Sequence, residues 1–264
     1  MTTADDKQHP LNEIRARLAG ASEANIGRQR RFWNKRAAAW DHHAQHNPGL
    51  VKVVERVIGD SKARPSDRVV DLGSGSGQLA LRLAPSVASV LAVDVSREMI
   101  SLLEENARRV GVSNVEGLAT PIEHLNLDPG SVDLVVSNYA LHHLRDHDKG
   151  IVVEHAAAWL RPGGRLVIGD MMFGISGSSE DRRIISSKLA LFAKKGPAGW
   201  WRIAKNAVRY LFRLQERPIP LDRWIALFEA AGLTDVSGSR VVNEAAVVRG
   251  MKPRHSNEVP TASP

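Results

Sequence analysis

Residues 69–77 read VVDLGSGSG, an apolar run that ends in a glycine-rich turn. Glycine permits positive φ and lets a ligand approach the backbone closely, so such a turn is typical of a ligand site at the end of a strand. The ligand could be a nucleoside triphosphate, a dinucleotide or a nucleoside without phosphate. A turn that only joins a strand to a helix is the alternative without a ligand.

Apolar runs and helical patterns alternate around this turn. The expected strands span residues 68–72, 89–95, 114–119, 131–138 and 164–170. A helix over 222–232 and a closing pair of strands follow near the end. Strands rich in Val, Ile and Leu that alternate with helices predict a parallel sheet with helices on both faces. Ligands bind to such a sheet at the carboxyl ends of its strands.

The spacing and charge of the turn favour a ligand without phosphate. No Lys-Ser/Thr pair follows Gly77, which excludes a P-loop. Gln78 stands where a dinucleotide fingerprint needs its third glycine. Asp71 would repel a pyrophosphate and attract an ammonium group, and Asp94 would accept hydrogen bonds from ribose hydroxyls. A ribose, a cationic head and no phosphate together describe S-adenosylmethionine (SAM).

With these residues the chain resembles the class I SAM-dependent methyltransferases, in particular their small-molecule branch of quinone, sterol, sugar and polyketide enzymes. The resemblance rests on VVDLGSGSG, VLAVDVSREMI (90–100), SVDLVVSNYALHHL (131–144) and LRPGGRLVIGD (160–170). It covers residues 66–171 closely and the last two strands more loosely. It implies a Rossmann-like α/β fold: a seven-stranded, mostly parallel sheet with an antiparallel last strand, and helical N-terminal and lid insertions.

The resemblance implies SAM as cofactor, S-adenosylhomocysteine as product, and Asp94 as the ribose carboxylate, with Met99 packed near the adenine. The implied cofactor residues are Asp71, Gly73, Ser74, Gly75, Gly77, Asp94, Val95, Met99, Leu118, Ala119 and Asn138.

One stretch departs from the family. The family usually has Gly-Asp-Ala after the third strand, and its Asp accepts from the adenine amine. Here the stretch is Gly117-Leu118-Ala119. Leu118 can pack on the ring but cannot accept that bond, so Thr120 or a backbone carbonyl is left as the acceptor.

The stretch NYALHHL (138–144) begins where the fourth strand should end, beside the transferred methyl group. It lacks the Asn/Asp-Pro-Pro-aromatic motif of methyltransferases that act on nitrogen in DNA or glutamine. We therefore expect methylation of oxygen, or of carbon. His143 is the expected base because imidazole titrates near neutral pH, and Asp170 would orient it or take the substrate proton itself. A solvated His143 with transfer by proximity alone is the alternative.

Aromatic residues and a second histidine are the expected contacts to the acceptor. These residues are Trp40, Tyr139, His142, Trp200 and Trp201. A packed, structural His142 is the alternative for that residue. His42 and His46 fall on one helical face beside His43, but no third ligand is placed near them, so we expect no metal site.

The helical pattern over 29–45 includes FWNKRAAAWDHHA, which is similar to the helix that this branch lays over the cofactor. The predicted organisation is an N-terminal tail (1–27), helices covering the cofactor (28–60), a SAM-binding core (61–171), a basic helical lid insertion (172–221), a final helix and strand pair (222–251) and a disordered tail (252–264).

The length of 264 residues suits one large domain or one domain with appendages, and the composition of 43% hydrophobic residues is enough for a core; there is no cysteine. Disulfides and thiolate metal sites are therefore excluded. No signal-like apolar segment follows Met1 and no apolar run reaches the length of a membrane span, so a cytoplasmic enzyme is expected.

The net charge of +7 is concentrated in one segment. Residues 182–217 contain ten Lys or Arg and one acidic residue, which gives +9 and leaves −2 for the rest. Arg202, Lys205, Arg209 and Arg213 would form one stripe of a helix whose broad face is apolar. This helix would cover the acceptor pocket as a lid, or its apolar face would also contact a lipid-like acceptor or an anionic membrane surface.

The sequence thus predicts a SAM-dependent methyltransferase that acts on a small, lipophilic acceptor. An RNA-modifying methyltransferase that holds phosphates with the basic segment is the alternative, although no separate RNA-binding motif is found and no DNA partner is expected. A nicotinamide oxidoreductase and an inactive SAM-binding protein are further alternatives. The oligomeric state is not predicted.

Overall fold

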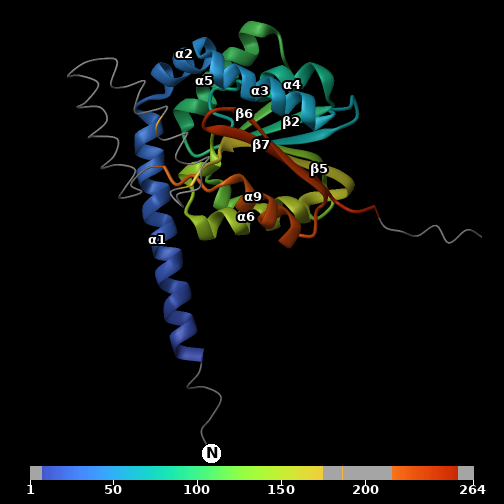
Figure 1. The fold of residues 1–264 in the computed structure, drawn as a ribbon. Helices are drawn as coiled ribbons and strands as arrows, with labels where there is room; N and C mark the ends of the chain where they lie inside the picture. The colour runs from blue at the N-terminus through green and yellow to red at the C-terminus, as the bar shows by residue number, and fades with distance from the viewer. Residues whose placement is uncertain (1–7, 175–185, 187–215, 255–264) are drawn as a thin grey trace, which may run out of the picture.

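The computed structural model describes residues 8–174, 186 and 216–254 (Figure 1). Seven strands form one sheet in the order β3-β2-β1-β4-β5-β7-β6. The first five pair in parallel, while β7 runs antiparallel to β5 and to β6. The strands are β1 (Arg68–Leu72), β2 (Ser89–Asp94), β3 (Val115–Ala119), β4 (Val132–Asn138), β5 (Leu160–Met171), β6 (Thr234–Val242) and β7 (Ala245–Met251). The predicted seven-stranded, mostly parallel sheet is confirmed.

Helices cover both faces of this sheet, with α3, α4 and α5 on one side and α6 and α9 on the other (Figure 1). The helices are α1 (Gln8–Asn34), α2 (Ala37–His46), α3 (Pro48–Ser61), α4 (Ala80–Leu83), α5 (Arg97–Val110), α6 (Asp146–Trp159) and α9 (Leu221–Ala230). Short 3₁₀ turns lie at η1 (Ala84–Ser86), η2 (Ile122–His124) and η3 (Leu141–His143).

Alternate residues of the central strands pack into two separate cores. Val70 and Leu72 of β1 belong to the core under α6 and α9, whereas Val69 belongs to the core under α3 and α4. Every residue of β4 from Val132 to Ser137 is buried. Because both faces of these strands are covered, they read as nearly continuous Val and Leu runs in the sequence.

The glycine turn after β1 connects two neighbouring strands at their carboxyl ends. The backbone N–H groups of Gly73 and Ser74 both donate to the Val93 carbonyl of β2, at 2.8 and 2.9 Å. Gly77 has a φ of +98°, and a Cβ added there would lie 2.9 Å from Leu81 Cγ. Gly77 is therefore required for the close approach of the turn to α4.

The N-terminal region differs from the sequence prediction. The segment predicted as a tail is helical from Gln8 onward, and the helix expected over 29–45 is interrupted between Asn34 and Ala37. The N-terminal half of α1 extends away from the layers of the domain (Figure 1). Leu11, Ile14 and Leu18 are its only large apolar residues, and although they are at helical spacing this stripe is too short for periodicity alone to predict the helix.

The predicted basic lid lies largely outside the described residues. Trp200, Trp201 and the basic stripe from Arg202 to Arg213 all fall in this part, so the interpretations of a lid and of a membrane contact remain predictions. Within the described part of the chain, no helix is long and apolar enough to cross a membrane.

The packing of α5 on the sheet gives a prediction for stability. Leu103 is fully buried, whereas Val110 on the same helix is 58% exposed. We expect Leu103→Ala to lower the free energy of unfolding by about 2–5 kcal/mol because it leaves a cavity in the core. Val110→Ala should change it by less than about 0.5 kcal/mol. Urea unfolding followed by circular dichroism measures both, and equal values would contradict this packing.

Candidate active site

A cleft lies along the carboxyl edge of the sheet, and residues at or after the ends of four neighbouring strands line it. Ile122 and Glu123 follow β3, and Asp94, Val95 and Met99 lie at the end of β2 and after it. Asp71, Gly73, Ser74 and Gly75 lie at the end of β1 and after it, and Asn138, Tyr139 and Ala140 lie at the end of β4 and after it. The N-terminal helices α1 to α3 add Ile26, Gln29, Trp33, Trp40, Ala44, Leu50 and Val54.

The turn after β1 and the loop after β4 cross at Gly73 with no space between them. Gly73 has a φ of +74°, and an added Cβ would lie 2.2 Å from the Cβ of Ala140. Only glycine fits this crossing. The crossing brings the two loops into one continuous wall of the cleft.

Asp71 places a buried carboxylate in this wall. Its side chain is 1% exposed, and neither carboxylate oxygen accepts a hydrogen bond from the described residues. Burial raises the pKa of Asp71 to about 7, an effect partly offset by the Ala80 amide and increased by the nearby charge of Asp94. A buried carboxylate without a donor is costly, so this group is suited to a cationic or hydrogen-bond-donating ligand.

Asp94 is held by backbone amides at the end of β2. Its Oδ2 accepts from the Gly75 N–H at 3.0 Å, and its Oδ1 accepts from the Ser96 N–H at 2.9 Å. Burial nevertheless raises the pKa of Asp94 to about 6. Ser96 in turn caps α5, since its Oγ accepts from the Met99 N–H. The sequence Asp-Val-Ser thus both orients the carboxylate and starts the next helix.

The helix α2 is fixed over the glycine turn by polar contacts. Asp41 Oδ1 accepts from Gln78 Nε2 at 3.2 Å and from Asn106 Nδ2 at 3.3 Å. Asn106 also donates to the Ser76 carbonyl at 3.0 Å. These contacts join α2, the turn and α5, and they position Trp40 above the turn, with its Nε1 3.9 Å from where a Cβ of Gly75 would lie.

Aromatic rings form the part of the cleft next to β4. Trp33 contacts Trp40 and His143 edge to face, with ring centroids 5.3 Å apart in both pairs. Tyr139 has a φ of +50°, a rare value for a bulky residue, and its N–H donates to the Gly169 carbonyl at 2.8 Å. Burial raises the pKa of Tyr139, so its hydroxyl stays protonated at neutral pH.

The predicted pairing of His143 with Asp170 is wrong. Asp170 accepts instead from the Nδ1 of His142 at 2.5 Å and from the His142 and Met171 backbone N–H groups at 2.8 and 2.7 Å. His142 and Asp170 are both buried, and neither is among the described residues that line the cleft. His143 does line the cleft, and its ring lies 4.0 Å from that of His142.

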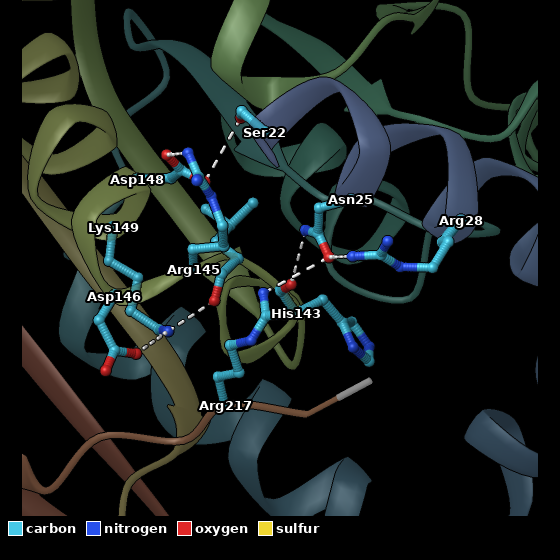
Figure 2. Close-up of polar contacts among 10 residues, drawn as sticks. Ser22, Asn25, Arg28, His143, Arg145, Asp146, Asp148, Lys149 and Arg217 are labelled. Atoms are coloured by element: carbon cyan, nitrogen blue, oxygen red, sulfur yellow. Dashed lines mark hydrogen bonds and ion pairs between the residues drawn. The ribbon is translucent and has the colours of Figure 1, made fainter. Parts of the chain in front are cut away.

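Donors from distant segments hold the carbonyls of the loop after β4. Asn25 of α1 donates to the His143 carbonyl at 3.2 Å, and the Arg217 backbone N–H donates to the His142 carbonyl at 2.6 Å. The Arg217 side chain also donates to Asn25 Oδ1 at 3.4 Å. Figure 2 shows Asn25, His143 and Arg217 converging at this point. The contacts join α1 and the segment before α9 to the histidine loop.

A buried lysine holds the next carbonyl of the same loop. Lys149 has no exposed surface, and its Nζ donates to the Leu144 carbonyl at 2.8 Å and to Asp146 Oδ1 at 3.1 Å (Figure 2). Burial lowers the pKa of Lys149 to about 8, although Asp146 acts in the opposite direction. Three successive carbonyls, which the 3₁₀ turn leaves without partners, are therefore satisfied by donors from three different elements.

The structure brings most of the predicted cofactor residues into the cleft. The predicted residues that line it are Asp71, Gly73, Ser74, Gly75, Asp94, Val95, Met99 and Asn138, together with Trp40, Tyr139 and His143. Gly77, Leu118 and Ala119 do not line it. Leu118 is 39% exposed, and its packing on a ligand base remains a prediction.

Several lining residues were missed. Trp33 lies within the helix that the sequence placed over the cofactor, so helical spacing from Trp40 could have found it. Gln29 follows the same face of α1. Glu123 lies on the short turn η2, for which the sequence has no pattern. Among the described residues, no cluster of three potential ligands forms a metal site, and the rings of His42 and His46 stack 4.5 Å apart.

Part of the cleft lies in a region that matches a known family of domains. A family model described as "Methyltransferase domain" matches residues 69–164. The uncharacterized methyltransferase YcgJ of Bacillus subtilis is 32% identical over 43% of this chain and 44% of that protein. The 27-O-demethylrifamycin SV methyltransferase of Amycolatopsis mediterranei is 30% identical over 50% of this chain and 48% of that protein. The chain thus spans about half the length of these curated relatives.

Solved structures share the fold at lower identity. The 1,6-didemethyltoxoflavin-N1-methyltransferase of Burkholderia thailandensis, with bound 1,6-didemethyltoxoflavin and S-adenosylhomocysteine, has a TM-score of 0.58 and 18% identity to this chain. The similarity covers 85% of this chain and 87% of that chain. At this identity the similarity concerns the fold, which agrees with the sheet order described above.

The raised pKa of Asp71 gives a prediction for the pH dependence of stability. Because the folded-state pKa lies above the unfolded one, the folded protein binds more protons between about pH 4 and 7, and its stability falls as the pH rises through this window. Asp71→Asn removes this loss. We expect the stability of the variant relative to wild type to increase by about 2–3 kcal/mol between pH 5 and pH 8.

Urea unfolding of both proteins at the two pH values measures this difference. Asp128→Asn, at an exposed carboxylate outside the cleft, is the control and should show no comparable change. A difference between Asp71→Asn and wild type that is the same at pH 5 and pH 8 would show that Asp71 titrates normally.

Proposed function

We propose that this chain, whose residues 69–164 match a methyltransferase domain model, transfers a methyl group from SAM to a small-molecule acceptor. The domain match and the sheet order support the family resemblance inferred from the sequence. The observation that carries the proposal is the buried Asp71, which lacks a hydrogen-bond donor beside the crossing at Gly73.

The charges of the cleft support a cationic nucleoside rather than a phosphate ligand. Its described lining includes the carboxylates Asp71, Asp94 and Glu123 but no Lys or Arg. Ser74 Oγ and Asn138 Oδ1 are also buried without a hydrogen-bond partner among the described residues. A phosphate would face only negative charge, whereas the ammonium and ribose of SAM would satisfy Asp71 and Asp94 respectively.

When bound, SAM supplies an electrophilic methyl group that a nucleophile displaces in line. The residues of the chain then have the tasks of holding the two partners and excluding water. Asp71, Ser74 and Asn138 would hold the amino-acid end of the cofactor, and Asp94 its ribose. Trp33 and Tyr139 would pack on the acceptor, since they line the cleft next to β4.

The apolar and aromatic walls support a small, lipophilic acceptor. The rifamycin methyltransferase and the toxoflavin methyltransferase have names that specify small-molecule acceptors, one at oxygen and one at nitrogen. We propose an oxygen acceptor here, with His143 as the base. His143 is suited to this role because it lines the cleft while the buried pair of His142 and Asp170 supports its ring.

Ligand binding tests the cofactor first. Isothermal titration calorimetry should show that the full chain binds S-adenosylhomocysteine and does not bind NADH. Asp94→Ala should weaken binding of S-adenosylhomocysteine by about 10–100-fold, because it removes a charge-assisted hydrogen bond to the ribose. Asp128→Ala is the control and should bind normally. Tight binding of NADH without binding of S-adenosylhomocysteine would refute the proposed function.

Methyl transfer tests the base. With radiolabelled SAM and a panel of hydroxylated aromatic acceptors, His143→Ala should lower kcat by about 10²–10⁴-fold on any acceptor that reacts, while the affinity for S-adenosylhomocysteine changes less than about threefold. His142→Ala should mainly lower the free energy of unfolding, because it leaves Asp170 buried without its partner. Turnover of His143→Ala within about threefold of wild type would leave only transfer by proximity.

A further inference from the structure

The two carboxylates proposed to hold the cofactor point to one face of the sheet. Successive side chains of a strand alternate between faces, and Val69 and Ala92 pack in the core under α3 and α4. Asp71 and Asp94 lie two residues further along the same strands, so they point to that face as well. The contact of Asp71 with the Ala80 amide of α4 agrees with this. On the proposed function, the cofactor therefore occupies the half of the cleft next to α4 and α5.

The other half of the cleft lies on the face that α6 and α9 cover. Ile122 of η2 and Leu144 of the loop after β4 belong to the core under these helices, and both also line the cleft. Their neighbours Glu123 and His143 line the same part of it. We call this part the acceptor half, since it contains the proposed base. Its lining from α1 consists of Ile26, Gln29 and Trp33.

Two polar side chains of the acceptor half have no hydrogen-bond partner among the described residues. Gln29 is 8% exposed, and no described residue hydrogen-bonds to its side-chain amide. Glu123 is partly buried, and no described side chain donates to its carboxylate, since the neighbouring His124 is paired with Glu23 of α1 at 2.8 Å. A desolvated carboxylate and a buried amide both gain from a ligand that supplies hydrogen-bond donors.

The charges around Glu123 favour a cationic donor over a neutral one. Burial raises the pKa of Glu123, its own amide and His124 lower it, and the charges of Asp148 and Glu23 raise it further. Arg145 also lies within electrostatic range, but its guanidinium donates twice to Asp148, at 2.7 Å each. A bound cation would offset both the desolvation and the nearby negative charge, whereas a hydroxyl would supply only a hydrogen bond and an anion would be repelled.

We infer that Glu123, together with Gln29, binds a cationic amine of the acceptor and thereby selects amine-bearing molecules for methylation. The inference rests on the proposed function and names the class of its acceptor. The ammonium would donate a charge-assisted hydrogen bond to Glu123 and a second bond to the carbonyl oxygen of Gln29. Ile26 and Ile122 would contact the apolar part of the acceptor.

The helix α1 sets the distance between the amine and the methylated hydroxyl. The ring of Trp33 contacts the ring of His143, the proposed base. A helix rises 1.5 Å per residue, so Gln29 and Ile26 lie about 6 and 10 Å along α1 from Trp33. We therefore expect an acceptor whose hydroxyl and amine are separated by about 6–10 Å, joined by an apolar linker.

Matched pairs of phenols test this class of acceptor. Each pair has one phenol with a para chain that ends in an ammonium group and one in which methyl replaces the ammonium, with chains of increasing length. Titration calorimetry on the full chain saturated with S-adenosylhomocysteine at pH 8, where the amine is charged and Glu123 ionised, measures binding. Wild type should bind the amine about tenfold or more tightly than its methyl counterpart in the pair of matching length.

Variants assign this preference to its residues. Glu123→Gln keeps the shape and removes the charge, so the preference for the amine should fall to within about threefold or reverse. Gln29→Leu removes a neutral partner and should lower the preference less. Glu116→Gln is the control, because it changes an exposed carboxylate of β3 that does not line the cleft, and it should behave as wild type. Thermal unfolding without ligand reports whether each variant is folded.

The outcomes separate this inference from the proposed function. Equal binding within every pair, or no binding of any phenol, overturns the inference, while binding of S-adenosylhomocysteine leaves the proposed function standing. A phenol with hydroxyl in place of the ammonium that binds as tightly overturns the selection of a cation. Retention of the amine preference by Glu123→Gln, or a loss of more than about tenfold in its affinity for S-adenosylhomocysteine, overturns the assignment to Glu123. If wild type binds neither S-adenosylhomocysteine nor a phenol, both fail.

Discussion

A buried carboxylate with no hydrogen-bond donor is the constraint on which this site depends. Asp71 lies at the carboxyl end of β1, and burial, together with the nearby charge of Asp94, raises its pKa to about 7. Such a group lowers the stability of the free protein at neutral pH and is stabilised by a ligand that brings positive charge. The crossing at Gly73 and the helix α2 above the turn keep this carboxylate from water, so the fold itself prepares a site for a cation.

The acceptor side depends on contacts between segments far apart in the chain. The carbonyls of His142, His143 and Leu144 are held by Arg217, Asn25 and Lys149. These donors come from the segment before α9, from α1 and from α6. The position of His143 in the cleft therefore depends on the docking of α1 and of the chain that follows the basic segment. A change in either would alter the acceptor wall without touching the cofactor residues.

The cofactor half of the site could be predicted from the sequence because it is built from local turns. Asp71, Gly73 and Gly75 lie within one short stretch after a strand, and Asp94 precedes the Ser96 cap that starts a helix. Parallel strands then bring these turns to one edge. The parallel sheet with helices on both faces could be predicted from the alternation of strands and helices, whereas the antiparallel last strand was expected only from the family resemblance.

The acceptor half could not be predicted to the same extent, because it depends on side-chain directions that no local pattern specifies. His142 and His143 are adjacent, and the positive φ of Tyr139 and the turn η3 decide which of them faces Asp170. Glu123 reaches the cleft from a three-residue turn, and α1 lacks a strong apolar period. In each case tertiary contacts determine where the side chain or helix lies, and the local sequence specifies only which residues are present.

The proton balance of ligand binding tests the central role of Asp71 most directly. Titration calorimetry of S-adenosylhomocysteine at pH 7, in buffers with different ionisation enthalpies, gives the number of protons exchanged. An ammonium beside Asp71 lowers the pKa of this carboxyl from about 7, so binding should release a fraction of a proton at pH 7, and Asp71→Asn should abolish most of the release. Proton uptake on binding, or equal release by wild type and Asp71→Asn, would contradict the account.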